Sequence, residues 1–146
     1  MRLVVALLAV LLAGCHALGG PSADPSARPN LGISNGTTLT VTLVVNGRPV
    51  GDFPAGGPNP TIDIAALPPL PWTVEARAPS ERVLASMVVK PGDVTATTVP
   101  GGGRALSGTM GRVDLSCGSL RIWAGDIMPS GPAPSEPPGS PGDCAP

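Results

Sequence analysis

The stretch "TTLTVTLVVNGRPVGDF", residues 37–53, decides the predicted fold. Its first half alternates threonines with aliphatic side chains, so that one face carries Leu39, Val41, Leu43 and Val45. Strict alternation that includes β-branched residues predicts a half-buried β-strand. Asn46-Gly47 follows at once, and because both residues tolerate a positive φ, the pair predicts a two-residue hairpin turn. The return run 48–53 contains Pro49, which cannot donate a ladder hydrogen bond, so we expect a short strand at a sheet edge.

A second hairpin is predicted further along the chain. The runs 72–78 and 83–89 alternate in the same way and are joined by the four-residue loop 79–82. One register puts every apolar pair on the same face: Ala78–Val83, Ala76–Ala85, Val74–Met87 and Trp72–Val89. Weaker strand candidates lie at 61–67 and 94–99.

The segment "RVDLSCGSLRIW", residues 112–123, predicts the last hairpin, with Cys117-Gly118 as its two-residue turn. On one face this register places the apolar pairs Leu115–Leu120 and Val113–Ile122. On the other face it places a polar pair, an opposite-charge pair and a cation–π pair, namely Ser116–Ser119, Asp114–Arg121 and Arg112–Trp123.

Trp123 is the one aromatic side chain that we expect on a solvent face. An exposed tryptophan between arginines is typical of a contact hot spot, so Trp123, Arg112 and Arg121 form a candidate contact surface. The alternative, which we favour, is that the proline-rich segment after the hairpin covers the indole, because prolines pack readily on it.

These short strands, separated by Gly/Pro turns, predict an all-β domain at 31–126: a small immunoglobulin-like or transthyretin-like sandwich of about seven strands. Residues 15–30 show no apolar periodicity and are expected to be a disordered tether. Residues 127–146 hold seven prolines, too many for a helix or a central strand, and are expected to be a tail.

The chain begins with one basic residue, Arg2, and the apolar run 3–12, the order that is typical of a secretory signal. A permanent membrane span needs about 20 apolar residues, so the run is too short for one. It ends in Leu12-Ala13-Gly14-Cys15, which resembles the lipobox of bacterial lipoproteins.

The lipobox resemblance implies that cleavage removes residues 1–14 and that the sulfur of Cys15 receives a diacylglyceryl group. Two acyl chains hold a protein stably on a membrane, whereas one gives only marginal binding. The alternative is an ordinary cleaved signal that happens to be followed by a cysteine.

The cysteine count agrees with a lipid on Cys15. The chain has three cysteines, and an odd number in an exported protein would leave a loose thiol. With Cys15 lipidated, Cys117 and Cys144 remain as an even pair in an oxidising compartment, so we predict a disulfide that pins the tail to the domain. The alternative use of these two cysteines is as metal ligands together with His16, which is less common outside the cytoplasm.

Several classes of function are disfavoured by the composition. The net charge is −1 and Lys90 is the only lysine, so the clustered basic residues that bind nucleic acid are missing. The acidic residues are scattered without a calcium-loop spacing, and we expect no metal and no cofactor. Gly32-Ile33-Ser34-Asn35-Gly36 matches the G-x-S-x-G pattern of serine hydrolases, but that chemistry needs a strand–turn–helix elbow and a histidine base. Because a strand follows and the only histidine is His16, we interpret the segment as a turn that enters the first strand.

Three further motifs have structural interpretations. Asn35-Gly36-Thr37 fits the N-glycosylation pattern but is better explained as turn chemistry. Residues 68–71, "PPLP", are interpreted as a rigid connection between strands rather than a polyproline ligand. Residues 101–103, "GGG", lack the lysine and helix of a phosphate loop and predict a flexible connection.

The sequence therefore predicts a non-enzymatic binding or structural module of the bacterial cell envelope, anchored outside the membrane by lipid on Cys15. Its expected partners are the membrane and an envelope protein or carbohydrate, and no nucleic acid. One alternative is an accessory or sensor lipoprotein that captures a small ligand, such as a sugar, for a membrane complex. Another is a hydrolase without histidine.

Overall fold

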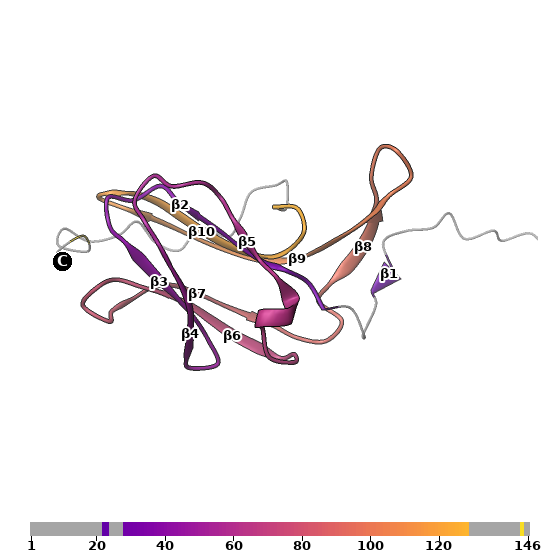
Figure 1. Ribbon diagram of the computed structural model, residues 1–146, viewed down its shortest axis with the longest axis horizontal. Coiled ribbons are helices and arrows are strands. Elements are labelled where there is room, and N and C mark those ends of the chain that lie inside the picture. The colour runs from indigo at the N-terminus through magenta and orange to yellow at the C-terminus, as the bar shows by residue number, and fades with distance from the viewer. Residues whose placement is uncertain (1–21, 24–27, 129–143, 145–146) are drawn as a thin grey trace, which may run out of the picture.

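The computed structural model describes residues 22–23, 28–128 and 144. Two antiparallel sheets pack face to face, which confirms the expected all-β sandwich (Figure 1). The elements in chain order are β1 (Ser22–Ala23), β2 (Leu31–Asn35), β3 (Val41–Val45), β4 (Arg48–Phe53), β5 (Thr61–Ile62), the 3₁₀ turn η1 (Ile64–Ala66), β6 (Trp72–Arg77), β7 (Val83–Val89), β8 (Thr95–Thr98), β9 (Arg104–Leu115) and β10 (Gly118–Gly125). One sheet has the order β1-β8-β9-β10-β2-β5 and the other has the order β4-β3-β6-β7.

The core lies between the two sheets. The alternating face predicted around β3 is buried there, and the same kind of face comes from β6 in the same sheet and from β10 in the opposite sheet. The largest fully buried side chains are Trp72, Leu31, Ile33, Leu43, Leu120 and Ile122. Burying an aliphatic or aromatic side chain of this size stabilises the fold by about 1.5–3 kcal/mol each, before the entropy of ordering it is subtracted.

Strand β2 corrects the interpretation of the G-x-S-x-G segment as a turn. Residues 31–35 form a strand that lies between β10 and β5, with Leu31 and Ile33 in the core. The sequence pattern concealed this strand because Gly32 and Ser34 on its other face, followed by Asn35, are residue types that usually mark turns.

Three other elements differ in length from the prediction. The strand expected from residue 37 begins at Val41, because residues 36–40 are held by side-chain hydrogen bonds instead of a ladder. Of the candidate 61–67, only Thr61–Ile62 is a strand, and η1 follows with Asp63 as its N-cap. Strand β9 is extended well before residue 112 and pairs with β8 as well as β10.

The predicted register of β6 and β7 is right for Trp72–Val89, Val74–Met87 and Ala76–Ala85. The fourth pair, Ala78–Val83, is wrong, because a bulge makes Arg77 the partner of Val83. The extra residue puts Leu84 and Ala85 side by side in the core and turns Val83 outward, where it is 45% exposed.

The predicted register of β9 and β10 is wrong by two residues. Leu115 pairs with Gly118 and Val113 pairs with Leu120, so the turn is Ser116-Cys117 rather than Cys117-Gly118. A shift by two keeps every side chain on its predicted face. It nevertheless separates all five predicted cross-strand pairs, including the opposite-charge pair and the cation–π pair, because Arg121 now faces Arg112 and Trp123 faces Met110.

The domain begins slightly earlier than expected. In the supposed tether 15–30, residues 22 and 23 form β1 and pair with β8, and Asn30 is bonded to the domain through its amide and its carbonyl. At the other end, β10 ends at Gly125, and the carboxylate of Asp126, the predicted last residue of the domain, accepts from the Leu106 N–H. Apart from Met128, Ile127 and Cys144, the tail lies outside the described residues.

Candidate binding pocket

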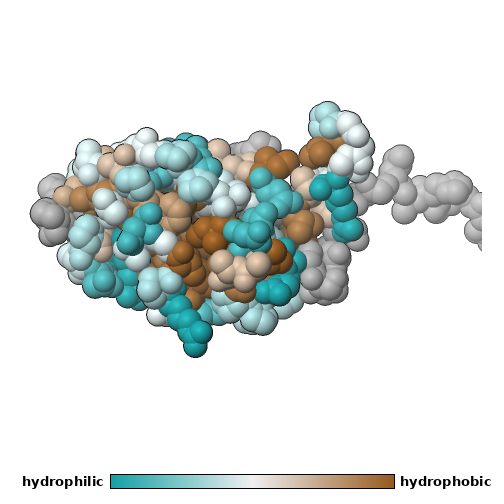
Figure 2. Space-filling model, viewed as in Figure 1, coloured by the Kyte–Doolittle hydropathy of each residue, from teal (hydrophilic) through white to brown (hydrophobic). Residues whose placement is uncertain are grey.

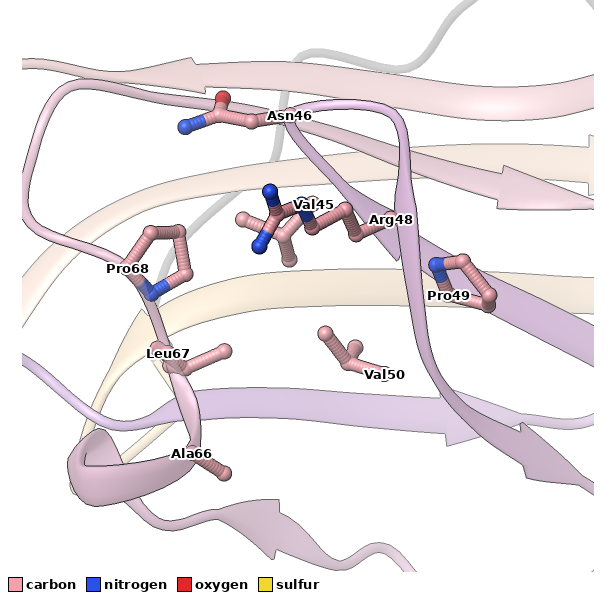
Figure 3. A pocket seen from close by; sticks show the side chains of 8 residues that line it. All are labelled: Val45, Asn46, Arg48, Pro49, Val50, Ala66, Leu67 and Pro68. Carbon is pink, nitrogen blue, oxygen red and sulfur yellow. The ribbon is translucent and has the colours of Figure 1, made fainter.

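A pocket with a volume of about 570 Å³ opens between the β3–β4 turn and the end of η1. Its lining residues are Val45, Asn46, Arg48, Pro49, Val50, Ala66, Leu67 and Pro68 (Figure 3). Small-molecule sites usually measure about 300–1,000 Å³ and are mostly apolar with a few polar groups, which describes this lining. On the face of the molecule that carries β4 and η1, Figure 2 shows apolar surface bordered by hydrophilic residues.

One wall of the pocket is held by the predicted Asn46-Gly47 turn, which the structure confirms with positive φ at both residues. The Asn46 side chain ties this turn to the next strand of the sheet, because its Nδ2 donates to the Pro71 carbonyl at 3.1 Å and its Oδ1 accepts from the Thr73 N–H at 2.8 Å. The backbone N–H of Asn46 also donates to the Thr73 carbonyl at 2.9 Å. The turn therefore cannot swing away from the sheet without breaking three hydrogen bonds.

The opposite wall comes from η1 and the run 68–71. The guanidinium of Arg28 donates to the Leu67 carbonyl at 3.0 Å, and the indole N–H of Trp72 donates to the Pro68 carbonyl at 2.8 Å. Because the ring of Trp72 is in the core, the second bond fixes Pro68 to the interior of the sandwich. The run 68–71 thus serves as the rigid connection that the sequence predicted between a strand candidate and β6.

Arg48 is the charged group of the pocket. Figure 3 shows its guanidinium directed over Val45 toward Pro68, while Val50 and Leu67 face each other below it. No described residue forms an ion pair or hydrogen bond with the Arg48 side chain, and no carboxylate belongs to the lining. Two other arginines of the described chain form ion pairs: Arg112 with Asp114 at 2.9 Å, and Arg77 with Glu75 and Glu81.

The ion pairs of Arg77 favour its charged form. The hydrogen bonds that the Arg77 guanidinium donates to Glu75 and, secondly, to Glu81 raise its pKa above the ordinary value, so it stays charged at every physiological pH. Among the described residues, no carboxylate accepts a hydrogen bond from the Arg48 guanidinium.

The sequence analysis did not single out Arg48 or the apolar lining. The lining residues that it named, Val45, Asn46, Pro49 and Pro68, were interpreted only as parts of a strand, a hairpin turn and a rigid connection. The pocket brings together segments about 20 residues apart, so no motif or spacing describes it. The available signal was an arginine directly after a hairpin turn, which is common on protein surfaces.

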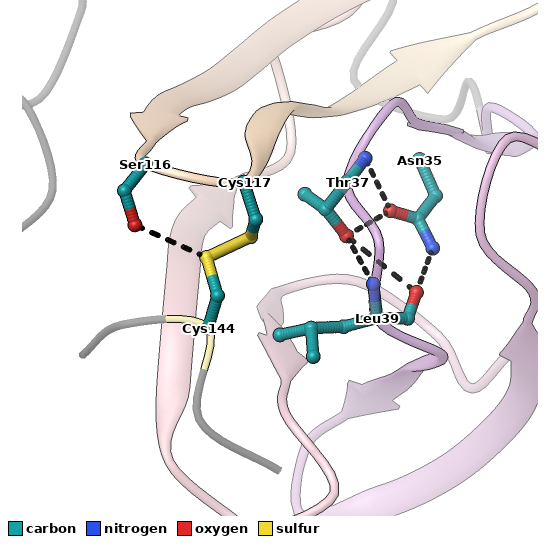
Figure 4. The surroundings of a disulfide bond; sticks show 6 residues. All are labelled: Asn35, Thr37, Leu39, Ser116, Cys117 and Cys144. Atoms are coloured by element: carbon teal, nitrogen blue, oxygen red, sulfur yellow. Dashed lines mark hydrogen bonds between the residues drawn. A yellow bond between two sulfur atoms is a disulfide. The ribbon is translucent and has the colours of Figure 1, made fainter. Parts of the chain in front are cut away.

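The predicted disulfide is present between Cys117 and Cys144, whose Cα atoms lie 5.9 Å apart (Figure 4). Cys117 is in the β9–β10 turn as expected, but it is half-buried against the core rather than exposed. The two cysteines are therefore unavailable as ligands for the alternative metal site. His16 and Cys15 lie outside the described residues.

Near the disulfide, Asn35 explains the glycosylation-like pattern as turn chemistry, as predicted (Figure 4). The side chain is 4% exposed, and its Nδ2 donates to the carbonyls of Leu39 at 2.8 Å and Phe53 at 2.9 Å. Its Oδ1 accepts from both the backbone N–H and the hydroxyl of Thr37, at 3.1 and 2.7 Å. In the connection between β2 and β3, which lie in different sheets, these side-chain hydrogen bonds replace the backbone hydrogen bonds of a β-ladder.

Trp123 is not exposed, so the hypothesis of an exposed contact residue is wrong, whereas the alternative that we favoured, a covered indole, agrees with its burial. Its neighbours Ile122 and Ala124 are in the core, so Trp123 points to the other face of the sheet, yet it is only 4% exposed. The indole lies across Gly32 of the adjacent strand, where a Cβ would fall 2.1 Å from the ring. Its Nε1 has no hydrogen-bond partner among the described residues.

Arg112 and Arg121, the other two residues of the candidate contact surface, lie opposite each other in the register of β9 and β10, on the face of the sheet that also carries Trp123. Arg112 is bonded to Asp114 in its own strand, and Arg121 lies between Arg112 and Ser34 in the registers of β9 and β2. The proposed cation–π pair of Arg112 with Trp123 does not form, because the register opposes Trp123 to Met110. Whether the proline-rich residues 129–143 pack on the indole lies outside the described residues.

Within residues 22–23, 28–128 and 144, no group of three or more metal-binding side chains forms. Over the same residues, no helix has the length and apolar character that crossing a membrane requires. Comparisons with protein-family models, with curated proteins and with solved structures found no match for this chain.

Proposed function

We propose that this protein is a lipid-anchored β-sandwich of the bacterial cell envelope that acts as a non-enzymatic binding module. The observation that carries the proposal is the Cys117–Cys144 disulfide. Such bonds persist in oxidising compartments and are rare in the cytosol. With these two of the three cysteines paired, Cys15 is left directly after the apolar run, at the position that the lipobox resemblance assigns to lipid.

The pocket supports a small molecule as the ligand of this binding module. Its lining provides an apolar surface and one cation but no nucleophile or carboxylate. These groups can hold and orient a ligand, whereas hydrolysis needs a positioned nucleophile or an activated water. The alternative of an accessory or sensor lipoprotein therefore becomes part of the proposal.

The anchoring is tested by expressing the full chain in bacteria and supplying a labelled fatty acid. We expect the label in the membrane-bound protein and its loss from the Cys15→Ser variant, which stays unprocessed or leaves the membrane. The matched control is the Cys117→Ser, Cys144→Ser double variant, which should keep the label. Equal labelling of the wild type and Cys15→Ser would contradict the proposal.

The role as a binding module is tested by crosslinking the anchored protein in intact cells and identifying what is captured. A single dominant partner that is lost when the β3–β4 turn is altered supports a module acting through the pocket. Capture that is unchanged by every substitution in the lining would contradict it.

A further inference from the structure

We infer that the pocket between β4 and η1 binds a small organic carboxylate with an aliphatic body, and that Arg48 pairs with the carboxylate. This inference rests on the proposed binding function and names the class of ligand. It is carried by the position of an unpaired guanidinium over an apolar floor.

The apolar part of the ligand is defined by the lining. Val45 and Leu67 are buried at the floor, and Val50 faces Leu67 across it, with proline rings on both sides (Figure 3). Val45 and Leu67 are already 0% and 5% exposed. Aliphatic carbons of a ligand would therefore mainly cover Val50, Ala66 and the proline rings, and would gain about 25 cal/mol for each Å² removed from water. No aromatic ring belongs to the lining, so the pocket lacks the flat surface on which a sugar ring would stack.

Arg48 defines the charged part of the ligand. Its planar guanidinium presents five donors and matches a carboxylate in bidentate geometry. No described acceptor occupies it, and a ligand carboxylate at the rim would meet no negatively charged side chain in the lining. Asn46, the other polar lining residue, already uses its amide on Pro71 and Thr73, so Arg48 supplies the charge recognition.

The walls are rigid enough to keep this arrangement in the absence of a ligand. The Asn46 bonds hold the turn that carries Arg48, and the Arg28 and Trp72 bonds hold the backbone at Leu67 and Pro68. A preformed pocket loses little conformational entropy in its walls when a ligand binds.

The test measures the binding of hexanoate to the full-length lipidated protein in neutral detergent by titration calorimetry. Acetate carries the charge without the aliphatic body, and hexanol carries the body without the charge. Glucose tests the neutral sugar. We expect hexanoate to bind more tightly than all three.

Two variants locate the site, and both change exposed side chains. Arg48→Gln should weaken hexanoate binding by about tenfold or more, because it removes a charge-assisted pair. Ala66→Phe should reduce it by filling the pocket. Arg121→Gln, an arginine on the other sheet, is the matched control and should bind as the wild type does. Unchanged melting temperatures of the variants would show that they are folded.

Equal hexanoate binding by the wild type and Arg48→Gln would overturn the inference, as would tighter binding of hexanol or glucose. Absence of hexanoate binding to the wild type would also overturn it. None of these results affects the fatty-acid labelling of Cys15, so a failure of the ligand class is distinguishable from a failure of the proposed anchoring.

Discussion

Hairpins β6–β7 and β9–β10 each carry one tryptophan, and the two rings are buried in different ways. Trp72 of β6 points into the core, is 0% exposed, and donates its N–H to the Pro68 carbonyl. Trp123 of β10 points away from the core and is 4% exposed, with its ring across Gly32. Its N–H has no partner among the described residues.

The two rings show that a buried side chain can have its polar group hydrogen-bonded or left without a partner. A buried donor without an acceptor costs about 1–3 kcal/mol relative to a bonded one, whereas apolar burial is favourable in both places. The core ring is therefore expected to contribute more stability than the outer ring, although their exposures are nearly equal.

The largest effect is expected for Trp72→Ala. Removal of the core indole leaves a cavity between the sheets and should lower the free energy of unfolding by about 3–5 kcal/mol. Urea denaturation followed by circular dichroism measures the change. A loss below about 1 kcal/mol would mean that the core collapses around the site. It would also contradict the larger contribution of Trp72 than of Trp123 to the free energy of unfolding.

The second effect concerns the turns. The β9–β10 turn is crosslinked to Cys144 across a separation of 27 residues, whereas the β6–β7 turn has only hydrogen bonds and the Arg77–Glu81 pair. Replacing Cys117 and Cys144 together by serine should cost about 3–4 kcal/mol in the chain-entropy model. The same urea midpoint for the oxidised protein and the double variant would contradict this.

The third prediction is Gly32→Ala. A Cβ at this position would lie 2.1 Å from Cε2 of Trp123, so the ring must move and the free energy of unfolding should fall by about 1–3 kcal/mol. Gly103→Ala is the control, because its nearest contact is a single methyl group of Val99 at 3.2 Å.

A double-mutant cycle shows whether the indole causes this cost. In a Trp123→Ala background, Gly32→Ala should have much less effect, because the clashing ring is gone. Additive losses would indicate that Gly32 is needed for a different reason.

The smallest effect is expected for Trp123→Phe. This change removes an unsatisfied donor, which favours the folded state, but it also removes part of the ring that packs on Gly32, so the net change in stability should stay within about 0.5 kcal/mol of the wild type. Trp72→Phe removes the donor from Pro68 and should cost about 1–3 kcal/mol. Each variant keeps one tryptophan, whose fluorescence follows unfolding. Equal losses would show that the Trp123 N–H is satisfied in solution.

The two hairpins also show how far register can be predicted from sequence. In β6–β7, apolar residues at alternating positions gave three correct pairs, and only the bulge near Val83 was missed. In β9–β10 the same reasoning chose the wrong pairs, because a shift by two residues leaves every side chain on the same face. Only the turn distinguishes the two registers.

Gly118 explains that error. It was assigned to the turn because glycine tolerates positive φ, but it is the first residue of β10. It does have a φ of 129°, and a Cβ there would fall 2.1 Å from the Gly36 carbonyl oxygen. The glycine is thus required by a close approach of a distant segment, which cannot be recognised from its neighbours in the sequence.

The sequence by itself determined the sandwich, most of its strands, the Asn46-Gly47 turn and the disulfide, because these depend on side-chain alternation, local φ preferences and cysteine number. Tertiary structure alone decided the burial of Trp123 on Gly32, the β9–β10 register and the pocket at Arg48. Each of these depends on contacts between segments far apart in the chain, whose packing leaves no periodic pattern within either segment.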